Sequence, residues 1–231
     1  MADPYLTAYR DTYRRIAGLA ADAGPALDVP LPACPDWAAR QLVAHLTGVA
    51  QDLAAGRLDG YGTEMWSAEQ VSRLGAEPID EVLRQWEAAM VDLAALTDSP
   101  LGGSASMWAF GDAVVHEGDL RPILAPGTRV PTEHVALGLK AAIGRWRHHL
   151  GEAGAPTLRL QATDLRDWWL GPHDDAEATT AATLGYDLFR ALFGRRSRLQ
   201  VEAWDWSGDP SPFLDLGLPF PFRWADGPLE D

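Results

Sequence analysis

Apolar side chains recur every three or four residues over most of the first two thirds of the chain, which is the spacing that lines one face of an α-helix. The pattern predicts five helices, at about residues 4–23, 36–56, 78–96, 104–120 and 131–150. Residues 57–77 are less periodic and have room for one further short helix. Helices of this length joined by short breaks favour a bundle. We therefore predict an up-down four-helix bundle with an extra helix over residues 1–152.

Short polar side chains and prolines mark where several of these helices begin. Asp36 can accept a hydrogen bond from a free amide of the first turn, and Ser104 can do the same for the fourth helix. Pro78 is followed by Asp80 and Glu81, and both proline and acidic residues suit a first turn. These features predict helix starts at Asp36, Pro78 and Ser104.

The hydrophobic period changes beyond Pro156. Residues 158–163 alternate apolar and polar side chains, as do residues 199–204, and a two-residue period predicts half-buried strands. Leucines four apart over 184–192 predict a helix between them, and Gly194 suits a left-handed helix end. We predict a small α+β domain over residues 156–231, and hence an α+β fold for the chain.

The composition of the chain argues against nucleic acids and membranes as binding partners. The chain has 33 acidic and 19 basic side chains and a formal net charge of -14, so its surface repels nucleic-acid backbones and anionic lipid headgroups. A single cysteine cannot form an internal disulfide. Neither the apolar stretch of a signal peptide nor the roughly 20 apolar residues that span a bilayer are found. We expect a cytoplasmic monomer or homodimer that binds small molecules and neither nucleic acid nor membranes.

Two histidines and an aspartate have the spacing of metal ligands on helices. Asp112 and His116 are four residues apart and Asp119 is three further on, so all three project from one side of the fourth helix. His45 lies on the face of the second helix that is predicted to pack into the bundle. Together, His45, Asp112 and His116 would leave a fourth position on zinc or a similar divalent cation for water or substrate.

Two structural interpretations fit the same spacing. An Asp and a His four residues apart on a helix are often a solvent-facing ion pair, and a lone histidine on an apolar face is usually a hydrogen-bonded core residue. Because a match of two residues has a high false-positive rate, spacing alone favours these structural interpretations over a metal site.

Two longer segments carry more information. The stretch PACPDWAARQLVAHL, which leads into His45, and the stretch DAVVHEGDLR, which begins at Asp112, resemble the two signature segments of the mycothiol-dependent maleylpyruvate isomerase family. That family is similar in turn to the DinB-like four-helix metal proteins, and its members often carry a C-terminal domain of the sterol-carrier type, as residues 156–222 would here. The resemblance implies that His45, Asp112 and His116 bind a divalent metal.

The chain departs from the family pattern at two places. The family has a glutamate where this chain has Asp112, whose carboxylate reaches about one bond length less far, so the helix has to approach the metal more closely. The family also often carries an arginine just before that carboxylate, where this chain has Trp108, Ala109, Phe110 and Gly111. The second difference bears on the class of substrate more than on metal binding.

The resemblance implies a thiol-dependent isomerase or S-transferase in an actinobacterial cytoplasm. Zinc lowers the pKa of a bound thiol, and the thiolate is the reactive form in addition and displacement. The family identifies that thiol as mycothiol, which would attack a small electrophilic substrate. The alternative is a non-catalytic module that keeps the fold and binds a ligand or protein partner.

Several further residues have a candidate role. Cys34 precedes a helix in a proline-flanked turn and is interpreted as a packed structural thiol. Asp119 would orient His116 or a neighbouring group, or else only pair with Arg121. Trp108, one turn before Asp112, is a candidate wall of the binding site. Arg195 and Arg196 belong to a basic patch that could meet an anionic substrate or thiol, although a helix end solvated by water is the favoured interpretation of that patch.

Overall fold

The computed structural model describes residues 3–96, 102–171 and 178–230. The chain forms two compact units, which meet in the sequence between Val130 and Pro131. The first unit is almost entirely helical, and the second combines helices with a four-stranded sheet. The predicted α+β class, with a helical bundle followed by a small α+β domain, is confirmed. Within the described part of the chain, no helix has both the length and the apolarity needed to cross a membrane.

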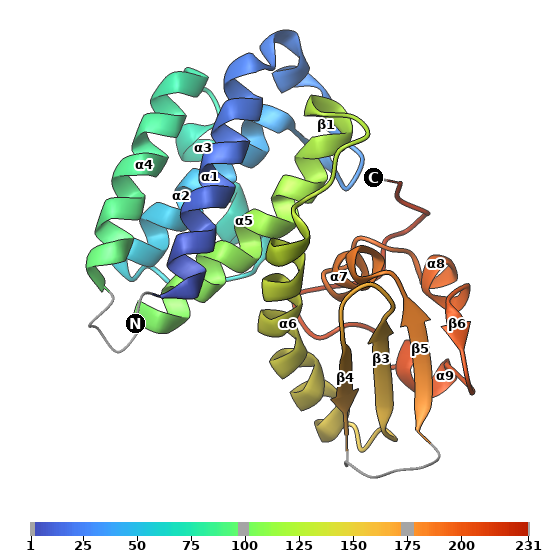
Figure 1. Ribbon diagram of the computed structural model, residues 1–231. Helices are drawn as coiled ribbons and strands as arrows, with labels where there is room; N and C mark the ends of the chain where they lie inside the picture. The colour runs from blue at the N-terminus through green and yellow to red at the C-terminus, as the bar shows by residue number, and fades with distance from the viewer. Residues whose placement is uncertain (1–2, 97–101, 172–177, 231) are drawn as a thin grey trace. The chain divides into compact units, whose positions relative to one another are not determined.

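Four long helices form the bundle of the first unit, and they are drawn from blue to light green in Figure 1. They are α1 (Pro4–Asp22), α2 (Ala39–Ala55), α4 (Ile79–Ala95) and α5 (Gly102–Leu124). A shorter helix, α3 (Glu64–Leu74), packs on the outside of α2 and is the extra helix that the sequence allows between residues 57 and 77. The bundle buries one apolar face of each long helix.

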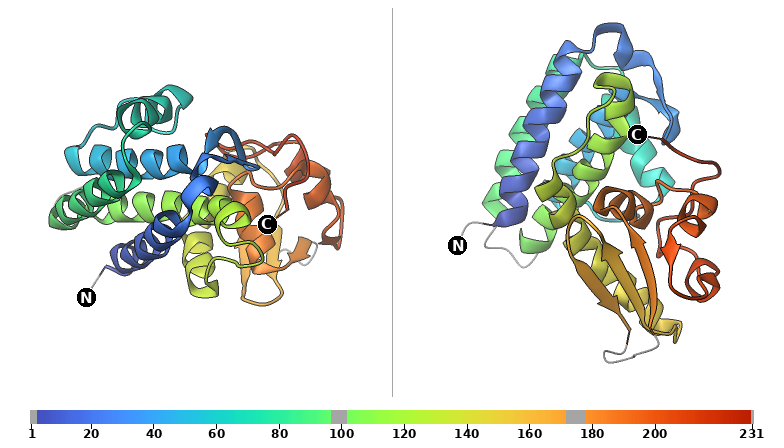
Figure 2. Two further views of the ribbon diagram at one scale, coloured as in Figure 1. Left: turned by 90° about the horizontal axis from the view of Figure 1, so that it is seen from above. Right: turned by 45° about the vertical axis from the view of Figure 1, so that its right-hand side comes forward.

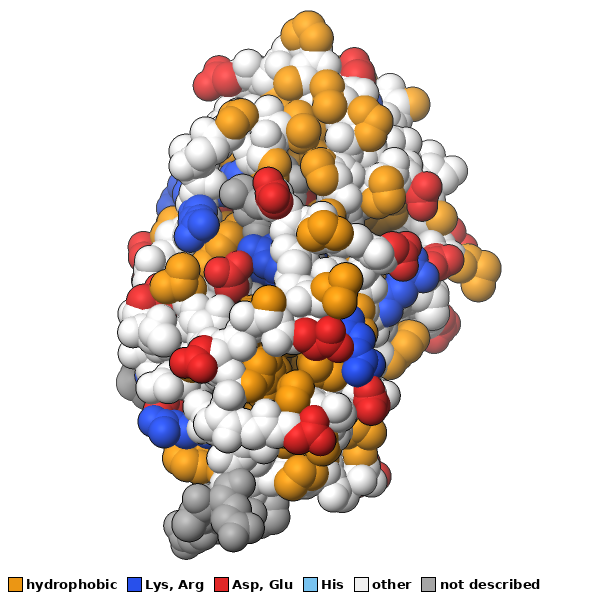
Figure 3. Space-filling model, turned by 90° about the vertical axis from the view of Figure 1, so that its right-hand side faces the viewer, with side chains coloured by type: hydrophobic (Ala, Val, Ile, Leu, Met, Phe, Trp, Pro, Cys, Tyr) orange, Lys and Arg blue, Asp and Glu red, His pale blue; other side chains and the backbone are white. Residues whose placement is uncertain are grey.

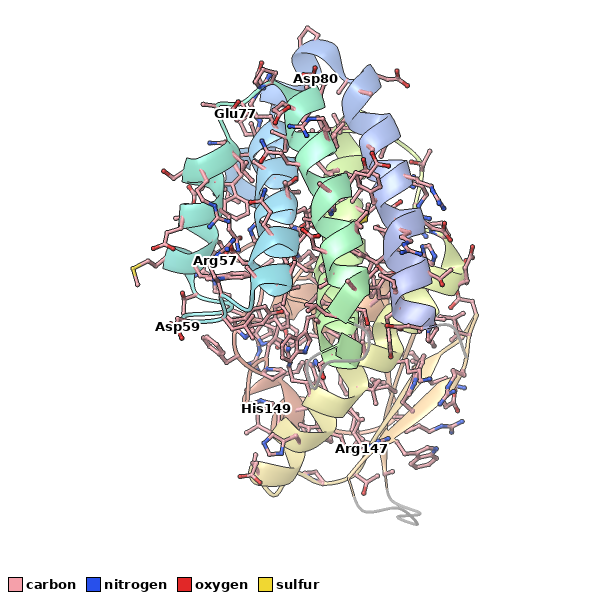
Figure 4. All side chains as sticks on the ribbon, turned by 90° about the vertical axis from the view of Figure 1, so that its left-hand side faces the viewer. Arg57, Asp59, Glu77, Asp80, Arg147 and His149 are labelled. Carbon is pink, nitrogen blue, oxygen red and sulfur yellow. The ribbon has the colours of Figure 1, made fainter. Side chains whose placement is uncertain are left out.

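The extra helix determines how the bundle helices run. Thr47 Oγ1 donates to the carbonyl of Val82 at 3.4 Å, and one turn further along both helices Gln51 Nε2 donates to Gln85 Oε1 at 3.1 Å. These contacts advance together along the sequence, so α2 and α4 run parallel. Because α3 takes the chain back between them, each helix still reverses the direction of the one before it. Figure 4 shows these helices lying side by side.

The second bundle helix begins later than the sequence predicts. Asp36 does not cap it but lies in β2 (Cys34–Ala38), which pairs antiparallel with β1 (Pro30–Leu31) after a short 3-10 helix at Gly24–Asp28. The helix starts at Ala39, where the Gln41 side chain accepts a hydrogen bond from the Ala38 amide at 2.8 Å. The hydrogen bond at this helix start therefore runs from the Ala38 amide to a side chain inside the helix. The predicted bond would have run from an amide of the first turn back to Asp36.

The other two predicted helix starts have different outcomes. Pro78 directly precedes α4, as predicted, and Asp80 and Glu81 lie in its first turn. Ser104 is already inside α5, because that helix begins at Gly102, so the predicted cap at Ser104 is wrong. At the other end, α5 continues to Leu124, beyond the predicted end near residue 120.

A buried carboxylate attaches α3 to α2. Asp52 of α2 is 3% exposed and accepts hydrogen bonds from Gln70 and Arg73 of α3 and from Arg57, which Figure 4 shows in the connection between the two helices. The helices approach so closely at Gly48 that a Cβ atom there would lie 2.5 Å from the Gln70 Cβ. Charge-assisted hydrogen bonds and a glycine contact therefore hold α3 in one position.

The second unit is a four-stranded sheet flanked by helices, as Figures 1 and 2 show. The strand order is β4-β3-β5-β6, with β3 antiparallel to β4 and parallel to β5, and β5 antiparallel to β6. The strands are β3 (Leu158–Ala162), β4 (Asp167–Leu170), β5 (Thr179–Thr183) and β6 (Asp205–Trp206). The helices are α6 (Thr132–Glu152), α7 (Gly185–Leu192), α8 (Arg198–Glu202) and α9 (Ser211–Leu214).

One helix belongs to a different unit from the one that the sequence suggests. We assigned residues 131–150 to the bundle on periodicity, within a domain of residues 1–152, but α6 packs against α7 and β4 of the second unit. Amphipathic periodicity shows that a helix has an apolar face and does not show which surface covers that face. The compact unit that contains the sheet therefore begins at Pro131 and not at residue 156.

Secondary structure in the second unit is partly as predicted. The alternation at residues 158–163 is strand β3, and the 184–192 leucines lie at or within α7, which is followed by Gly194 at a φ of 77°. The strand predicted at residues 199–204 is wrong, because this segment forms α8. The Ser197 side chain accepts from the Gln200 amide and Gln200 accepts from the Ser197 amide, a reciprocal cap that starts a helix. Leu199 is 73% exposed, unlike a core-facing strand residue.

Charged side chains are dispersed over the surface. On the face shown in Figure 3, the red acidic side chains are spread among apolar and basic ones. Over the described part of that face no extended basic area is seen, in keeping with a net charge of -14. The absence of a nucleic-acid partner stays a prediction from charge.

The Asp52 network predicts a measurable loss of stability. Replacing Asp52 with Ala should lower the free energy of unfolding by about 2 to 3 kcal/mol, because the Gln70 amide would stay buried without this partner while both guanidinium groups can reach water. Urea denaturation would measure the change. Asp11→Ala is the matched control, since Asp11 only forms an exposed pair with Arg14 and should cost about 0.5 kcal/mol or less. Equal effects in the two variants would contradict the structural role of Asp52.

Candidate metal centre

The three residues expected to bind metal come together inside the first unit. His45 projects from α2, and Asp112 and His116 project from consecutive turns of α5. Each offers one donor atom, and all three donor atoms lie within 4.8 Å of one another. The two histidine rings are 5.3 Å apart at 85°, so they face the same space from different directions. The shorter side chain of Asp112 therefore still reaches both imidazoles.

The distances between the Asp112 oxygens and the histidine nitrogens are closer to those between two ligands of one metal ion than to hydrogen-bond lengths. Asp112 Oδ2 is 3.4 Å from His45 Nε2, and Asp112 Oδ1 is 3.6 Å from His116 Nε2. Normal N–H···O hydrogen bonds are about 2.7 to 3.2 Å long. Two ligands about 2.0 to 2.1 Å from a tetrahedral ion are roughly 3.3 to 3.4 Å apart. The two distances from Asp112, each to a different carboxylate oxygen, are thus close to the separation of two ligands on a shared small cation.

Burial argues against the two structural interpretations of the same residues. The side chains of His45 and His116 are only 5% and 10% exposed, so they do not form a solvent-facing ion pair with Asp112. His45 is not a hydrogen-bonded core histidine either, because its buried Nδ1 atom has no hydrogen-bond partner among the described residues. Asp112, at 27%, is the most exposed of the three, so the cluster reaches the surface on its side.

A buried carboxylate fixes the orientation of His116. Asp119 Oδ2 lies 2.7 Å from His116 Nδ1, and the Asp119 side chain is fully buried. An ionised carboxylate only accepts hydrogen bonds, so Nδ1 carries the proton and the Nε2 lone pair is directed towards Asp112. Cys34 Sγ donates to the same carboxylate oxygen at 3.6 Å. This carboxylate–histidine arrangement is the one that supports histidine ligands in metal sites.

Cys34, His116 and Asp119 form a second group of possible ligands. It would use His116 Nδ1, the nitrogen that already donates to Asp119. A cation there would have to break that hydrogen bond, whereas a cation at His45, Asp112 and His116 Nε2 keeps it. The first set is therefore the better candidate metal centre.

Tyr9 of α1 is a neighbour of the site that the sequence analysis treated only as part of an apolar stripe. It is fully buried, and its hydroxyl accepts from Trp86 Nε1 at 2.6 Å. Burial raises the pKa of the Tyr9 phenol, the Trp86 hydrogen bond acts in the opposite direction, and the Asp112 carboxylate raises it further. The phenol therefore stays protonated at neutral pH beside the candidate ligands. No sequence pattern separates it from the other apolar-face tyrosines.

Four aromatic side chains surround the ligands, and we call them the aromatic arc: Trp37, Tyr61, Trp66 and Trp108. Ring centroids follow one another from Trp37 to His45 at 5.0 Å, His45 to Trp66 at 6.4 Å, Trp66 to Tyr61 at 5.0 Å and Tyr61 to Trp108 at 5.5 Å. Trp108 was expected beside the site, but Tyr61 and Trp66 were missed because they lie in the weakly periodic segment between the second and third predicted helices.

The predicted arginines lie in the second unit. Arg196 is 6% exposed and pairs with Asp187 at 2.7 Å, while Arg195 Nη1 donates to the carbonyl of Phe193 at 2.8 Å. Both side chains thus have partners within that unit. A role of Arg195 or Arg196 in binding a thiol or substrate stays a prediction.

The contact between Asp119 and His116 predicts an effect on metal affinity. Asp119→Asn should weaken zinc binding about 10- to 100-fold, because the amide is a poorer acceptor for the Nδ1 proton and no longer raises the basicity of the ligand. Competition against a chromophoric chelator would measure it. Asp92→Asn, on the exposed face of α4, is the control and should leave the affinity unchanged. An unchanged affinity in Asp119→Asn would exclude a supporting role for this carboxylate.

Comparison with known proteins finds one matching family and two similar structures. Residues 9–121 match the family described as mycothiol maleylpyruvate isomerase N-terminal domain. A search of the curated proteins finds no match. Two crystal structures of mycothiol-dependent maleylpyruvate isomerase, one of a histidine-to-alanine mutant with a TM-score of 0.58 and one with 0.57, are similar at 13% identity over 88% of this chain and 91% of theirs. At that identity the structures establish the fold, and the family match over residues 9–121, which lie in the first unit, is the similarity that the two signature segments predict.

Proposed function

We propose that the chain is a metal-dependent isomerase or S-transferase that uses mycothiol as its thiol. The observation that carries the proposal is the convergence of His45 Nε2, Asp112 and His116 Nε2 at ligand spacing, with Asp119 supporting His116. The family match to the mycothiol maleylpyruvate isomerase N-terminal domain supports mycothiol as the thiol. Zinc is our choice of metal, because two imidazoles and one carboxylate are a common ligand set for catalytic zinc.

Each residue of the site has a defined task in this proposal. A divalent cation such as zinc, when bound, lowers the pKa of a coordinated thiol so that it is a thiolate at neutral pH. His45, Asp112 and His116 would hold the cation and leave one position open for that thiol. Asp119 keeps the proton on His116 Nδ1, which preserves the Nε2 lone pair for binding. The protonated Tyr9 phenol adds no further negative charge beside Asp112.

A thiolate can isomerise a conjugated double bond without being consumed and without any other reactant. The thiolate would add to one carbon of a conjugated double bond, forming a C–S bond while the π electrons move to the carbonyl oxygen. The former double bond is then a single bond and can rotate. When the electrons return, the C–S bond breaks and the thiolate leaves unchanged. An S-transferase would follow the same first step, after which the α-carbon would take up a proton, equivalent to the one that the thiol lost, and the C–S bond would be retained. The cytoplasmic location and the actinobacterial source stay predictions.

Metal analysis tests the ligand set. The purified wild-type protein should bind about one zinc ion per chain, and His45→Ala, His116→Ala and Asp112→Ala should each lose most of it, because a three-ligand site keeps little affinity with two. Asp112→Glu should keep the metal, since it retains a carboxylate. His148→Ala, an exposed histidine of α6, is the control for nonspecific loss. Full metal content in His45→Ala or His116→Ala would show that the ligands lie elsewhere.

The open ligand position gives a second prediction, which separates the enzyme from a binding module. In the cobalt-substituted protein, mycothiol should change the visible spectrum and give a sulfur-to-cobalt absorption, because the thiolate enters the cobalt coordination shell. The same addition to the Asp112→Ala variant should have no effect. If the visible spectrum of the cobalt protein stays unchanged when mycothiol is added, the result would favour the non-catalytic module that keeps only the fold.

A further inference from the structure

The aromatic arc borders the exposed side of the candidate metal centre. Trp108 lies one helical turn before Asp112 on α5, and Asp112 is the ligand that reaches solvent. Trp66 is 7% exposed and forms the buried part of the arc, whereas Trp37, Tyr61 and Trp108 are each half-buried. The arc therefore presents partly accessible ring surface directly beside the position that a substrate must reach.

Contacts of α3 hold the buried part of the arc in place. Trp66 Nε1 donates to the carbonyl of Arg57 at 3.4 Å, and its helix begins with Thr63, whose side chain accepts from the Trp66 amide at 3.3 Å. The same helix is attached to α2 by the buried Asp52. Trp66 is therefore a fixed ring, and Tyr61 packs against it at 5.0 Å, so this part of the arc loses little conformational entropy when a ligand packs on it.

Charge near the arc disfavours an anionic ligand group. The exposed side chains next to Tyr61 and Trp66 in the sequence include Asp59 and Glu64. Arg57 and Arg73 share the single carboxylate of Asp52, so these three groups keep one net positive charge, which the two carboxylates of Asp59 and Glu64 outweigh. Figure 4 shows Arg57 and Asp59 together in the segment that connects α2 with α3. Aromatic faces with acidic neighbours suit a flat apolar group better than a carboxylate.

We propose that the aromatic arc binds a flat aromatic group of the electrophilic substrate, with Tyr61 and Trp108 as the specificity-determining residues. The proposal names a substrate class for the site and in that respect rests on the proposed function. The ring would stack on or pack edge-on against Tyr61 and Trp108, while the electrophilic carbon extends towards the side where Asp112 is exposed. Such contacts add to the gain from apolar burial, and stacking geometry favours a planar ring over a puckered one of equal size.

A matched pair of unreactive ketones tests the arc without any thiol chemistry. Calorimetry on the zinc-loaded protein would compare 4-phenylbutan-2-one with 4-cyclohexylbutan-2-one, which differ only in having a planar or a puckered ring. We expect the phenyl ketone to bind about 3- to 10-fold more tightly. Trp108→Leu and Tyr61→Leu should each remove most of that preference. Tyr13→Leu is the control, since Tyr13 packs on Trp86 between α1 and α4 and is not in the arc.

The outcomes of this test are distinct. Equal binding of the two ketones to the wild type, or a preference that survives in both Trp108→Leu and Tyr61→Leu, would overturn the proposal. Conversion of cis- to trans-4-phenylbut-3-en-2-one with mycothiol present tests the proposed function separately. A phenyl preference without any mycothiol-dependent conversion would retain the arc as a binding surface and reject the isomerase. Mycothiol-dependent conversion together with equal binding of the two ketones would retain the isomerase and reject the arc.

Discussion

The approach of α2 to α5 is the constraint on which the candidate site depends. A single imidazole from one helix has to meet a carboxylate and a second imidazole from the other, and the donor atoms are only 3.4 and 3.6 Å apart. The bundle secures this approach with small and apolar residues along both helices, while Asp119 fixes one of the two rings. Burying two histidines and two carboxylates together costs desolvation free energy that a bound cation would recover.

The same bundle positions the surroundings of the site through one extra helix. Because α3 takes one pass outside the bundle, α2 and α4 run parallel and the face of α2 near His45 is covered by Trp66. Asp52 and Gly48 set that contact from the α2 side. The metal ligands, the histidine support and the aromatic arc thus all belong to the first unit, which is also the part that matches the family.

The sequence predicted the bundle, and the three residues that come together in it, better than it predicted local boundaries. Long amphipathic periods located α1, α4 and α6, and the segments around His45 and Asp112 identified three residues that the fold brings together. Asp36 was misassigned because a short carboxylate before an apolar period does not by itself locate a helix start, and Asp36 lies inside β2. Residues 199–204 alternate like a strand, but the Ser197 and Gln200 signal, which was available in the sequence, shows a helix start. Apart from Trp108, the arc could not be predicted, because Tyr61 meets Trp108 and Trp66 meets His45 only through tertiary packing.

X-ray absorption at the zinc edge, with and without mycothiol, tests the central claim most directly. For the zinc-loaded protein, we expect two imidazole nitrogens and carboxylate oxygen at about 2.0 to 2.2 Å from the zinc ion. Once mycothiol is added, we expect one sulfur at about 2.3 Å from it. A first shell of oxygen atoms without imidazole scattering, or a shell that mycothiol leaves unchanged, would contradict a thiol-binding metal centre on His45, Asp112 and His116.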